Sequence, residues 1–173
     1  VEDAIRYAVS RGALVVIAGG NTFEEGNEIE VLAEIASRVP GAISVGATDR
    51  TGDRAYYSST GPYIEIAAPG GSFLTGGNNG LVYQQTLHFD ATDTFNLPPS
   101  LFHAPSFNVL AFVGAQGTST AAPHVSGLAA LLMAQGVTKP AAIEAAIRQF
   151  ATDMGAPGRD VEFGFGLIDA RAT

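Results

Sequence analysis

Helix-spaced and continuous runs of apolar residues alternate along the first part of the chain. Ile5, Ala8 and Val9 recur at helical spacing, and the wholly apolar run Leu14 to Ile17 follows Gly12. A strand that is apolar throughout, rather than at every second position, is typical of a parallel sheet covered on both faces. The pattern therefore predicts a helix followed by a buried strand.

The same rhythm continues further along the chain. We predict a helix over Glu28 to Ser37, a second buried strand over Ala42 to Ala47 and a short third strand over Tyr63 to Ala67. Strands that alternate with helices indicate an α/β fold. The expected fold is the second half of a doubly wound, mostly parallel sheet with helices on both faces, in which Leu14 to Ile17 and Ile43 to Ala47 are adjacent.

The composition changes after Gly70, where Gly, Asn, Pro and aromatic residues dominate to about Pro105. Strand-like pieces occur within and just after this stretch, at Leu81 to Leu87 and Val109 to Val113. We interpret residues 74–112 as a long irregular insertion, because stretches of this length and texture are commonly functional.

Two helices are predicted in the last third of the chain. The first, Ala121 to Ala134, is apolar nearly all round, so we expect it to be buried. Pro123 lacks an N–H and is tolerated in a first turn, which places the start of this helix near Ser119. The second is amphipathic and runs from Lys139 to Phe150. No internal repeat or linker is evident, so residues 1–173 are interpreted as one domain or part of one.

Composition and charge exclude several classes of protein. The chain has 173 residues, 46% of them hydrophobic, and a mean hydropathy of +0.19, as in a soluble globular domain. Its longest apolar runs are far shorter than the roughly 18 to 20 residues that span a bilayer. A net charge of −8 with a single lysine argues against nucleic-acid binding. The absence of cysteine excludes disulfides, thiolate zinc sites and a cysteine nucleophile.

The acidic residues are concentrated in one segment. It carries five glutamates within eleven residues: Glu24, Glu25, Glu28, Glu30 and Glu34. Such a run forms either a solvated face or a cation site.

A serine precedes the apolar helix, in the segment Gly117 to Gly127, which reads Gly-Thr-Ser-Thr-Ala-Ala-Pro-His-Val-Ser-Gly. Ser119 at the N-terminus of a helix lies in the positive end of the helix dipole, where an alkoxide or oxyanion is favoured. It is therefore a candidate nucleophile. On position alone, a helix N-cap is the better explanation of Ser119.

An asparagine follows the first predicted strand, behind two glycines. Asn21 at the carboxyl end of a parallel strand offers an amide N–H₂ beside open backbone, as an oxyanion donor requires. Taken alone, Gly19-Gly20-Asn21 is also an ordinary turn.

Together these segments resemble the subtilisin-like serine peptidases, specifically the C-terminal half of the catalytic domain. The resemblance covers most of the chain, including Pro40 to Ala47, Tyr57 to Pro62, Ala68 to Gly70 and the closing Gly-x-Gly-Leu-Ile-Asp. It implies a serine endopeptidase with Ser119 as nucleophile and Asn21 in the oxyanion hole. It also implies that Ala18, Gly19 and Gly20 form a wall of the pocket for the residue before the scissile bond. Thr120 departs from the family, which usually has Met there.

A larger departure concerns the catalytic Asp and His, which the family carries in its first half and this chain does not contain. His124 lies five residues beyond Ser119 on the same helix, about 140° round it, so its ring is expected to point away and to be packed and hydrogen-bonded. His88 and His103 fall in the long loop, where nothing places them near Ser119. We therefore expect the chain alone to be inactive.

The resemblance implies a polypeptide substrate, an extracellular location and no required cofactor. A structural Ca²⁺ or Na⁺ near Val39 to Ala42 and Glu65 is a further expectation, since some family members bind a metal there through backbone carbonyls. The expected partner is the missing N-terminal half of the domain or a second copy of the chain. The sequence is equally compatible with a truncated chain, a processed two-chain enzyme and a natural half-protein.

Other classes of function fit less well. The main alternative is a catalytically dead fragment that acts as a folding or oligomerising unit. The Gly-rich turns match neither nucleotide-binding pattern, G-x-G-x-x-G or G-x-x-x-x-G-K-[ST]. Ser119 lacks the two flanking glycines of an α/β-hydrolase elbow.

Overall fold

A computed structural model describes residues 1–88 and 106–173, and side chains are described outside residues 87–109. The chain divides into two compact units. The larger unit comprises Val1–Val82 and Gln116–Thr173, and the smaller comprises Tyr83–Ala115. Each is described by itself.

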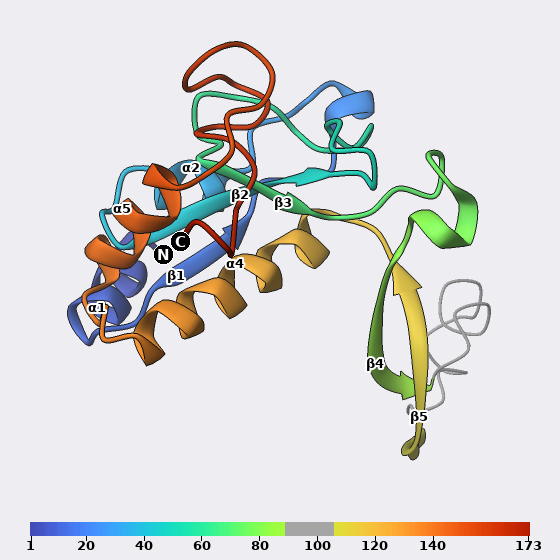
Figure 1. Ribbon diagram of the computed structural model, residues 1–173, viewed down its shortest axis with the longest axis horizontal. Coiled ribbons are helices and arrows are strands. Elements are labelled where there is room, and N and C mark those ends of the chain that lie inside the picture. Colours follow the sequence, from blue (N-terminus) through green and yellow to red (C-terminus); the bar gives the residue numbers. More distant parts are fainter. Residues whose placement is uncertain (89–105) are drawn as a thin grey trace. The chain divides into compact units, whose positions relative to one another are not determined.

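The larger unit is built on a three-stranded parallel sheet (Figure 1). Its strands are β1 (Val15–Ala18), β2 (Ala42–Thr48) and β3 (Ile66–Pro69), in the order β1-β2-β3. In the parallel register, Val16 pairs with Ile43 and Val45 pairs with Ile66. The expected parallel α/β sheet and the adjacency of the first two strands are thus confirmed.

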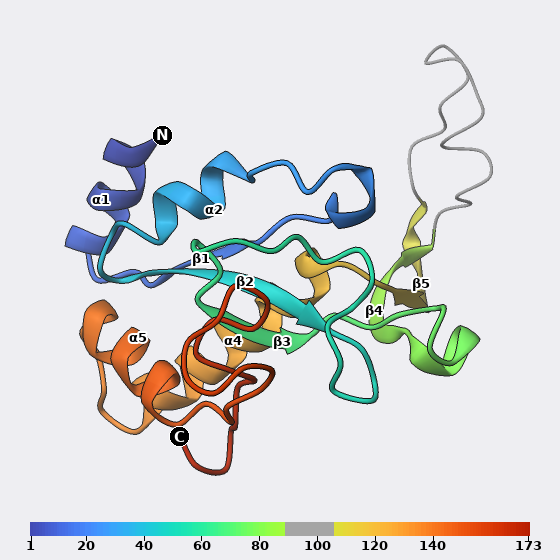
Figure 2. The ribbon, with the colours of Figure 1, turned by 90° about the horizontal axis from the view of Figure 1, so that it is seen from above.

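Helices cover both faces of this sheet (Figure 2). On one face lie α1 (Glu2–Ser10) and α2 (Val31–Ala36), and on the other lie α4 (Thr118–Ala134) and α5 (Pro140–Gln149). A strand between two helical layers must be apolar on both sides, and every residue of β2 is buried. Its side chains therefore contribute to two hydrophobic cores, one that includes Val45 and Val125 and another that includes Ile5 and Ala36.

Two elements are less buried than their sequences predict. β1 is only half-buried along its whole length, because among the described residues it pairs with β2 alone and forms an edge of the sheet. Helix α4 buries the face that carries Val125, Leu128 and Leu132, while Leu131 and Met133, which flank that face on its two sides, are 56% and 42% exposed. The apolar character of a segment shows that it can be buried, but it does not specify which neighbours cover it.

Several element boundaries differ from the expectation. β3 begins at Ile66 rather than Tyr63, and α2 is shorter than the predicted Glu28 to Ser37. Helix α4 begins at Thr118, so Pro123 lies in its second turn and not its first. The i−4 acceptor that Pro123 leaves unbonded is the carbonyl of Ser119, close to the helix end, where such a loss disturbs little.

The remaining described elements are short. Two 3₁₀ turns, Phe23–Glu25 and Gly77–Gly80, follow β1 and β3. In the smaller unit, β4 (Val82–His88) and β5 (Ser106–Ala115) form a two-stranded sheet where strand-like pieces were predicted. Within the described residues no helix is both long and apolar enough to span a bilayer.

Candidate active site

Ser119 is the second residue of α4 and is exposed. The N-cap is Gly117, so the alternative interpretation of Ser119 as a helix cap is wrong. Backbone N–H groups of a first helical turn have no partner within the helix, and that of Ser119 has no acceptor among the described residues. Its hydroxyl and its N–H thus both stand at the positive end of the helix dipole.

Asn21 follows β1 and faces the start of α4. Its Oδ1 accepts hydrogen bonds from the Thr118 N–H at 2.8 Å and from Thr118 Oγ1 at 3.0 Å. The Thr118 hydroxyl in turn accepts from the Gly20 N–H at 3.2 Å. Because two donors hold Oδ1, the orientation of the amide is fixed and its N–H₂ group is turned away from Thr118.

Gly117 marks the place where the serine and the asparagine meet. A Cβ atom on Gly117 would lie 3.0 Å from Ser119 Oγ and 3.5 Å from Asn21 Nδ2, so both polar atoms border the same small space. The glycine has φ +148, a conformation that residues with side chains rarely adopt. The structure therefore brings together the two residues that the sequence singled out from segments nearly 100 positions apart.

Hydrogen bonds from Tyr57 and Thr120 hold the backbone around Gly117 in place. The Gly117 N–H donates to Tyr57 Oη at 2.8 Å and to the Gly70 carbonyl at 3.0 Å. Burial raises the pKa of Tyr57, so its hydroxyl stays protonated and donates to the Gly71 carbonyl at 2.7 Å. Thr120, where the family usually has Met, donates to the Gly70 carbonyl at 2.6 Å.

These supporting roles of Thr118, Thr120 and Tyr57 were missed by the sequence analysis. Thr118 and Thr120 lay inside the recognised motif, which was the signal available, but their partners are remote in sequence. Tyr57 begins a segment that resembles the family, but it lies 60 positions from Gly117 and nothing in that segment indicated this contact.

His124 does not approach Ser119. Its Nδ1 lies 2.9 Å from the carbonyl of Thr120 on its own helix, which confirms that the ring is hydrogen-bonded away from the serine. It is exposed rather than packed. His103 lies outside the described residues, as does the side chain of His88. Within the described part of the chain, no hydrogen bond joins Ser119 Oγ to a histidine or a carboxylate.

Gly19 and Gly20 bring the main chain that precedes Asn21 close to its neighbours. A Cβ on Gly19 would lie 2.6 Å from Ile64 Cδ1, and one on Gly20 would lie 2.8 Å from Ser59 Oγ. Neither position accepts a side chain without a shift of its neighbours. The main chain beside Asn21 is thus packed closely against Ile64 and Ser59, and the role of Ala18, Gly19 and Gly20 as a pocket wall stays a prediction.

The Glu65 carboxylate, which we expected to add to the backbone carbonyls of a cation site near Val39 to Ala42, is paired with other residues, and the carbonyl site stays a prediction. Glu65 is 1% exposed, and its Oε1 forms an ion pair with Arg148, which also pairs with the buried Glu144. Its Oε2 accepts from the Ser44 N–H at 3.1 Å. An arginine thus already occupies the carboxylate that a metal would need. Among the described residues no three His, Asp or Glu side chains are placed to hold a metal.

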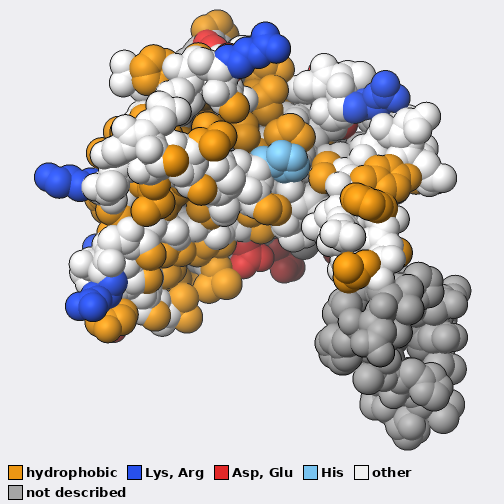
Figure 3. Space-filling model, turned by 60° about the horizontal axis from the view of Figure 1, so that its bottom comes forward, with side chains coloured by type: hydrophobic (Ala, Val, Ile, Leu, Met, Phe, Trp, Pro, Cys, Tyr) orange, Lys and Arg blue, Asp and Glu red, His pale blue; other side chains and the backbone are white. Residues whose placement is uncertain are grey.

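The charge distribution agrees with the absence of a basic stripe. On the face drawn in Figure 3, Lys and Arg side chains lie singly and far apart. The acidic run Glu24 to Glu34 takes part in one described ion pair, between Arg38 and Glu34 of α2 at 3.5 Å. The flank of the site that follows Asn21 is therefore negatively charged.

Comparison with known proteins agrees with this geometry. The model of the subtilase family matches residues 1–166. The chain belongs to the subtilase family. Curated relatives of this subtilase include an extracellular protease of Xanthomonas campestris pv. campestris, 34% identical, and a thermostable alkaline protease of Halalkalibacterium halodurans, 33% identical. Both matches cover 100% of the chain but only 25% and 38% of the relatives' lengths.

Solved structures show the same fold. A protease from Pseudoalteromonas arctica superposes with a TM-score of 0.72 at 32% identity, over 99% of this chain and 44% of the other. Fervidolysin from Fervidobacterium pennivorans, a keratinolytic enzyme related to subtilisin, gives 0.71 at 27% identity over 99% and 24%. The expected subtilisin-like fold is thus confirmed.

Proposed function

We propose that this chain carries the nucleophile and the oxyanion hole of a secreted serine endopeptidase. The observation that carries the proposal is the shared position of Ser119 Oγ and Asn21 Nδ2 beside Gly117. A tetrahedral intermediate needs a nucleophile and hydrogen-bond donors within reach of one carbonyl group. The extracellular location is proposed from the name of the Xanthomonas relative, an extracellular protease.

The reaction is acyl transfer from a peptide to Ser119. Ser119 Oγ attacks the carbonyl carbon, and the oxyanion that forms accepts hydrogen bonds from Asn21 Nδ2 and the Ser119 N–H. The acyl-enzyme is then hydrolysed by water. The bonds from Thr118 to Asn21 Oδ1 hold the amide in place before the charge develops. Such preorganisation is what makes a donor effective in a transition state.

The general base and its orienting carboxylate come from outside residues 1–173. Serine at its ordinary pKa is a weak nucleophile and needs an adjacent base, and no described residue supplies one. The missing groups reach Ser119 from the N-terminal half of the domain, which binds at the open edge of β1. The chain by itself is therefore inactive.

A fluorophosphonate probe with matched variants tests this proposal. In an active protease that contains this chain, Ser119 should be labelled rapidly and Ser119→Ala not at all. Asn21→Ala should lower kcat for peptide hydrolysis by roughly 10²- to 10³-fold with little change in KM, the effect measured in subtilisin itself. The isolated chain should label no faster than Ser119→Ala.

Two outcomes would contradict the proposal. Rapid labelling of the isolated chain would mean that a base is present within residues 1–173. Failure of any assembly that contains the chain to react at Ser119 would favour the alternative, a catalytically dead folding or oligomerising unit.

A further inference from the structure

The turn that carries Tyr57 is bonded to the segment around Asn21. The Phe23 N–H donates to the main-chain carbonyl of Tyr57 at 3.2 Å. The Ser59 N–H donates to the carbonyl of Gly20 at 3.0 Å. Main-chain groups on both sides of Asn21 are thus held by this one turn.

The side chain of Tyr57 is bonded to the other segment of the site, the one that carries Ser119. Its hydroxyl accepts from the Gly117 N–H at 2.8 Å and donates to the Gly71 carbonyl at 2.7 Å, and the residue is only 6% exposed. The packing here is close, since a Cβ on Gly70 would lie 2.9 Å from Tyr57 Oη and 2.8 Å from the Gly117 carbonyl oxygen. Tyr57 therefore contacts one segment of the site through its main chain and the other through its hydroxyl.

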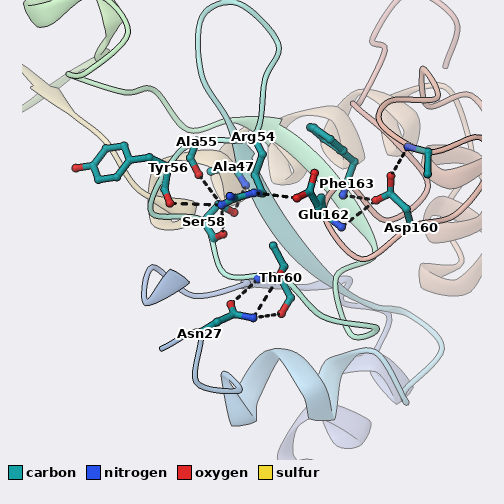
Figure 4. Close-up of polar contacts among 11 residues, drawn as sticks. Asn27, Ala47, Arg54, Ala55, Tyr56, Ser58, Thr60, Asp160, Glu162 and Phe163 are labelled. Carbon is teal, nitrogen blue, oxygen red and sulfur yellow. Dashed lines mark hydrogen bonds and ion pairs between the residues drawn. The ribbon is translucent and has the colours of Figure 1, made fainter. Parts of the chain in front are cut away.

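Arg54 holds the main chain of this turn. Its guanidinium donates to the carbonyls of Ala55 at 3.1 Å and Ser58 at 2.8 Å, and it pairs with Glu162 at 3.5 Å (Figure 4). The turn is also bonded to β2, because Ser58 Oγ accepts from the Ala47 N–H at 3.0 Å. The backbone that presents the tyrosine hydroxyl is therefore fixed on both sides.

Tyr56 is a neighbouring tyrosine whose hydroxyl has a different kind of partner. The two rings meet edge to face, with centroids 5.1 Å apart, and the ring of Tyr56 points away from Arg54 (Figure 4). Its Oη accepts from Gln116 Nε2 at 2.8 Å. The Tyr56 hydroxyl thus reaches a side chain, whereas the Tyr57 hydroxyl reaches the main chain of Gly117.

We infer that Tyr57 is a positioning residue whose hydroxyl sets the place of Ser119 relative to the Asn21 amide. The inference rests on the proposed function, because this placement matters only if the two groups act on one carbonyl. A Cβ on Gly117 would border both Ser119 Oγ and Asn21 Nδ2, so a displacement of Gly117 alters the space that they share. A small misplacement of reacting groups slows the chemical step more than it weakens substrate binding.

Tyr57→Phe tests the inference in the active protease that contains this chain, because it removes the hydroxyl and keeps the ring. The kcat for peptide hydrolysis should fall about 10-fold, the effect on the barrier of roughly one lost hydrogen bond. The KM should change less than about twofold. The rate of fluorophosphonate labelling at Ser119 should fall by a similar factor as kcat. Rates are compared under conditions in which urea denaturation shows every variant to be fully folded.

The matched control is Tyr56→Phe, which removes a hydroxyl from the adjacent residue and also keeps the ring. Because the Tyr56 hydroxyl bonds only the side chain of Gln116, kcat and the labelling rate should stay within about twofold of the wild-type values. The comparison separates the bond to Gly117 from a general effect of losing a tyrosine hydroxyl in this turn.

A second measurement separates positioning from a general loosening of the fold. If Tyr57 acts by placing Ser119 beside the Asn21 amide, its hydroxyl matters less once that amide is gone. In an Asn21→Ala background, Tyr57→Phe should therefore lower kcat by less than about threefold. A structural effect on the whole domain would give the same loss in both backgrounds.

The outcomes separate the inference from the proposed function. Normal hydrolysis with no effect of Tyr57→Phe on kcat would overturn the role of Tyr57 and leave the proposed function intact. Equal losses from Tyr57→Phe and Tyr56→Phe, equal losses in the two backgrounds, or a raised KM at unchanged kcat would do the same. Absence of hydrolysis and of probe labelling at Ser119 would overturn the proposed function, and the inference with it.

Discussion

Glu65 is the most deeply buried acidic residue of the described chain. It lies just before β3, paired with Arg148 and bonded by the Ser44 N–H. Burial raises the pKa of Glu65, and the attraction of Arg148 offsets this only in part. Taking a carboxylate out of water disfavours its charged form, so the folded protein retains this proton to a higher pH than the unfolded chain does.

A pH-dependent stability follows from this shift. Between the ordinary glutamate pKa of 4.5 and the raised value, the folded state binds more protons than the unfolded state, so the free energy of unfolding falls as pH rises. Glu65→Gln cannot ionise and should remove this part of the slope. Urea unfolding from pH 4.5 to 8 measures both proteins, with exposed Glu24→Gln as control. Parallel curves for wild type and Glu65→Gln would show that the prediction is wrong.

At the scale of elements, Thr118 joins the end of β1 to the start of α4. Its buried hydroxyl accepts from the Gly20 N–H and donates to Asn21 Oδ1, so one side chain fixes both the Gly20 backbone and the Asn21 amide. β1 and α4 are adjacent in the fold but far apart in the sequence. The relative position of Asn21 and Ser119 therefore depends on this contact.

Thr118→Val keeps the shape of the side chain and removes both hydrogen bonds. The Gly20 N–H is then left without its acceptor, which should lower the free energy of unfolding by roughly 1–3 kcal/mol. The comparison is Ser126→Ala on the same helix, where an exposed hydroxyl bonds only the Ala122 carbonyl and the expected change is within about 0.5 kcal/mol. Urea denaturation of both variants measures these changes in the free energy of unfolding. Equal midpoints would show that Thr118 does not link the two elements.

At the scale of the whole molecule, the two edges of the parallel sheet differ. Beyond β3, Ala67 bonds Gly166 and Ile168 of the closing segment. β1 has no such neighbour among the described residues, and α4, which packs against β1, exposes Leu131 and Met133 on the two sides of its buried face. An open strand edge near exposed apolar side chains is a place where another polypeptide binds.

We therefore expect the isolated chain to self-associate at micromolar concentration, through a second copy or an exchanged segment such as residues 74–112. Sedimentation should give a mass above the 17.8 kDa of the monomer. The double substitution Leu131→Lys and Met133→Lys should shift the equilibrium towards monomer, because it places charge at two exposed apolar positions of α4. Tyr7→Lys, on α1 at the other face of the sheet, is the matched control. A well-behaved wild-type monomer with cooperative unfolding would contradict the expectation.

The parallel strands and the two residues that meet at the candidate site could be predicted from the sequence alone. Continuous apolar runs identify strands that lie between helical layers, and the segments around Ser119 and Asn21 are specific enough to be recognised. These signals are local, so a reading along the chain finds them.

Which distant groups come into contact depends on the tertiary structure. Arg148 lies 83 positions from Glu65, and Thr118 lies 97 positions from Asn21, so neither pairing leaves a periodic trace in the sequence. The half-burial of β1 and α4 was unpredictable for the same reason, because apolarity does not specify which neighbour is present to cover it.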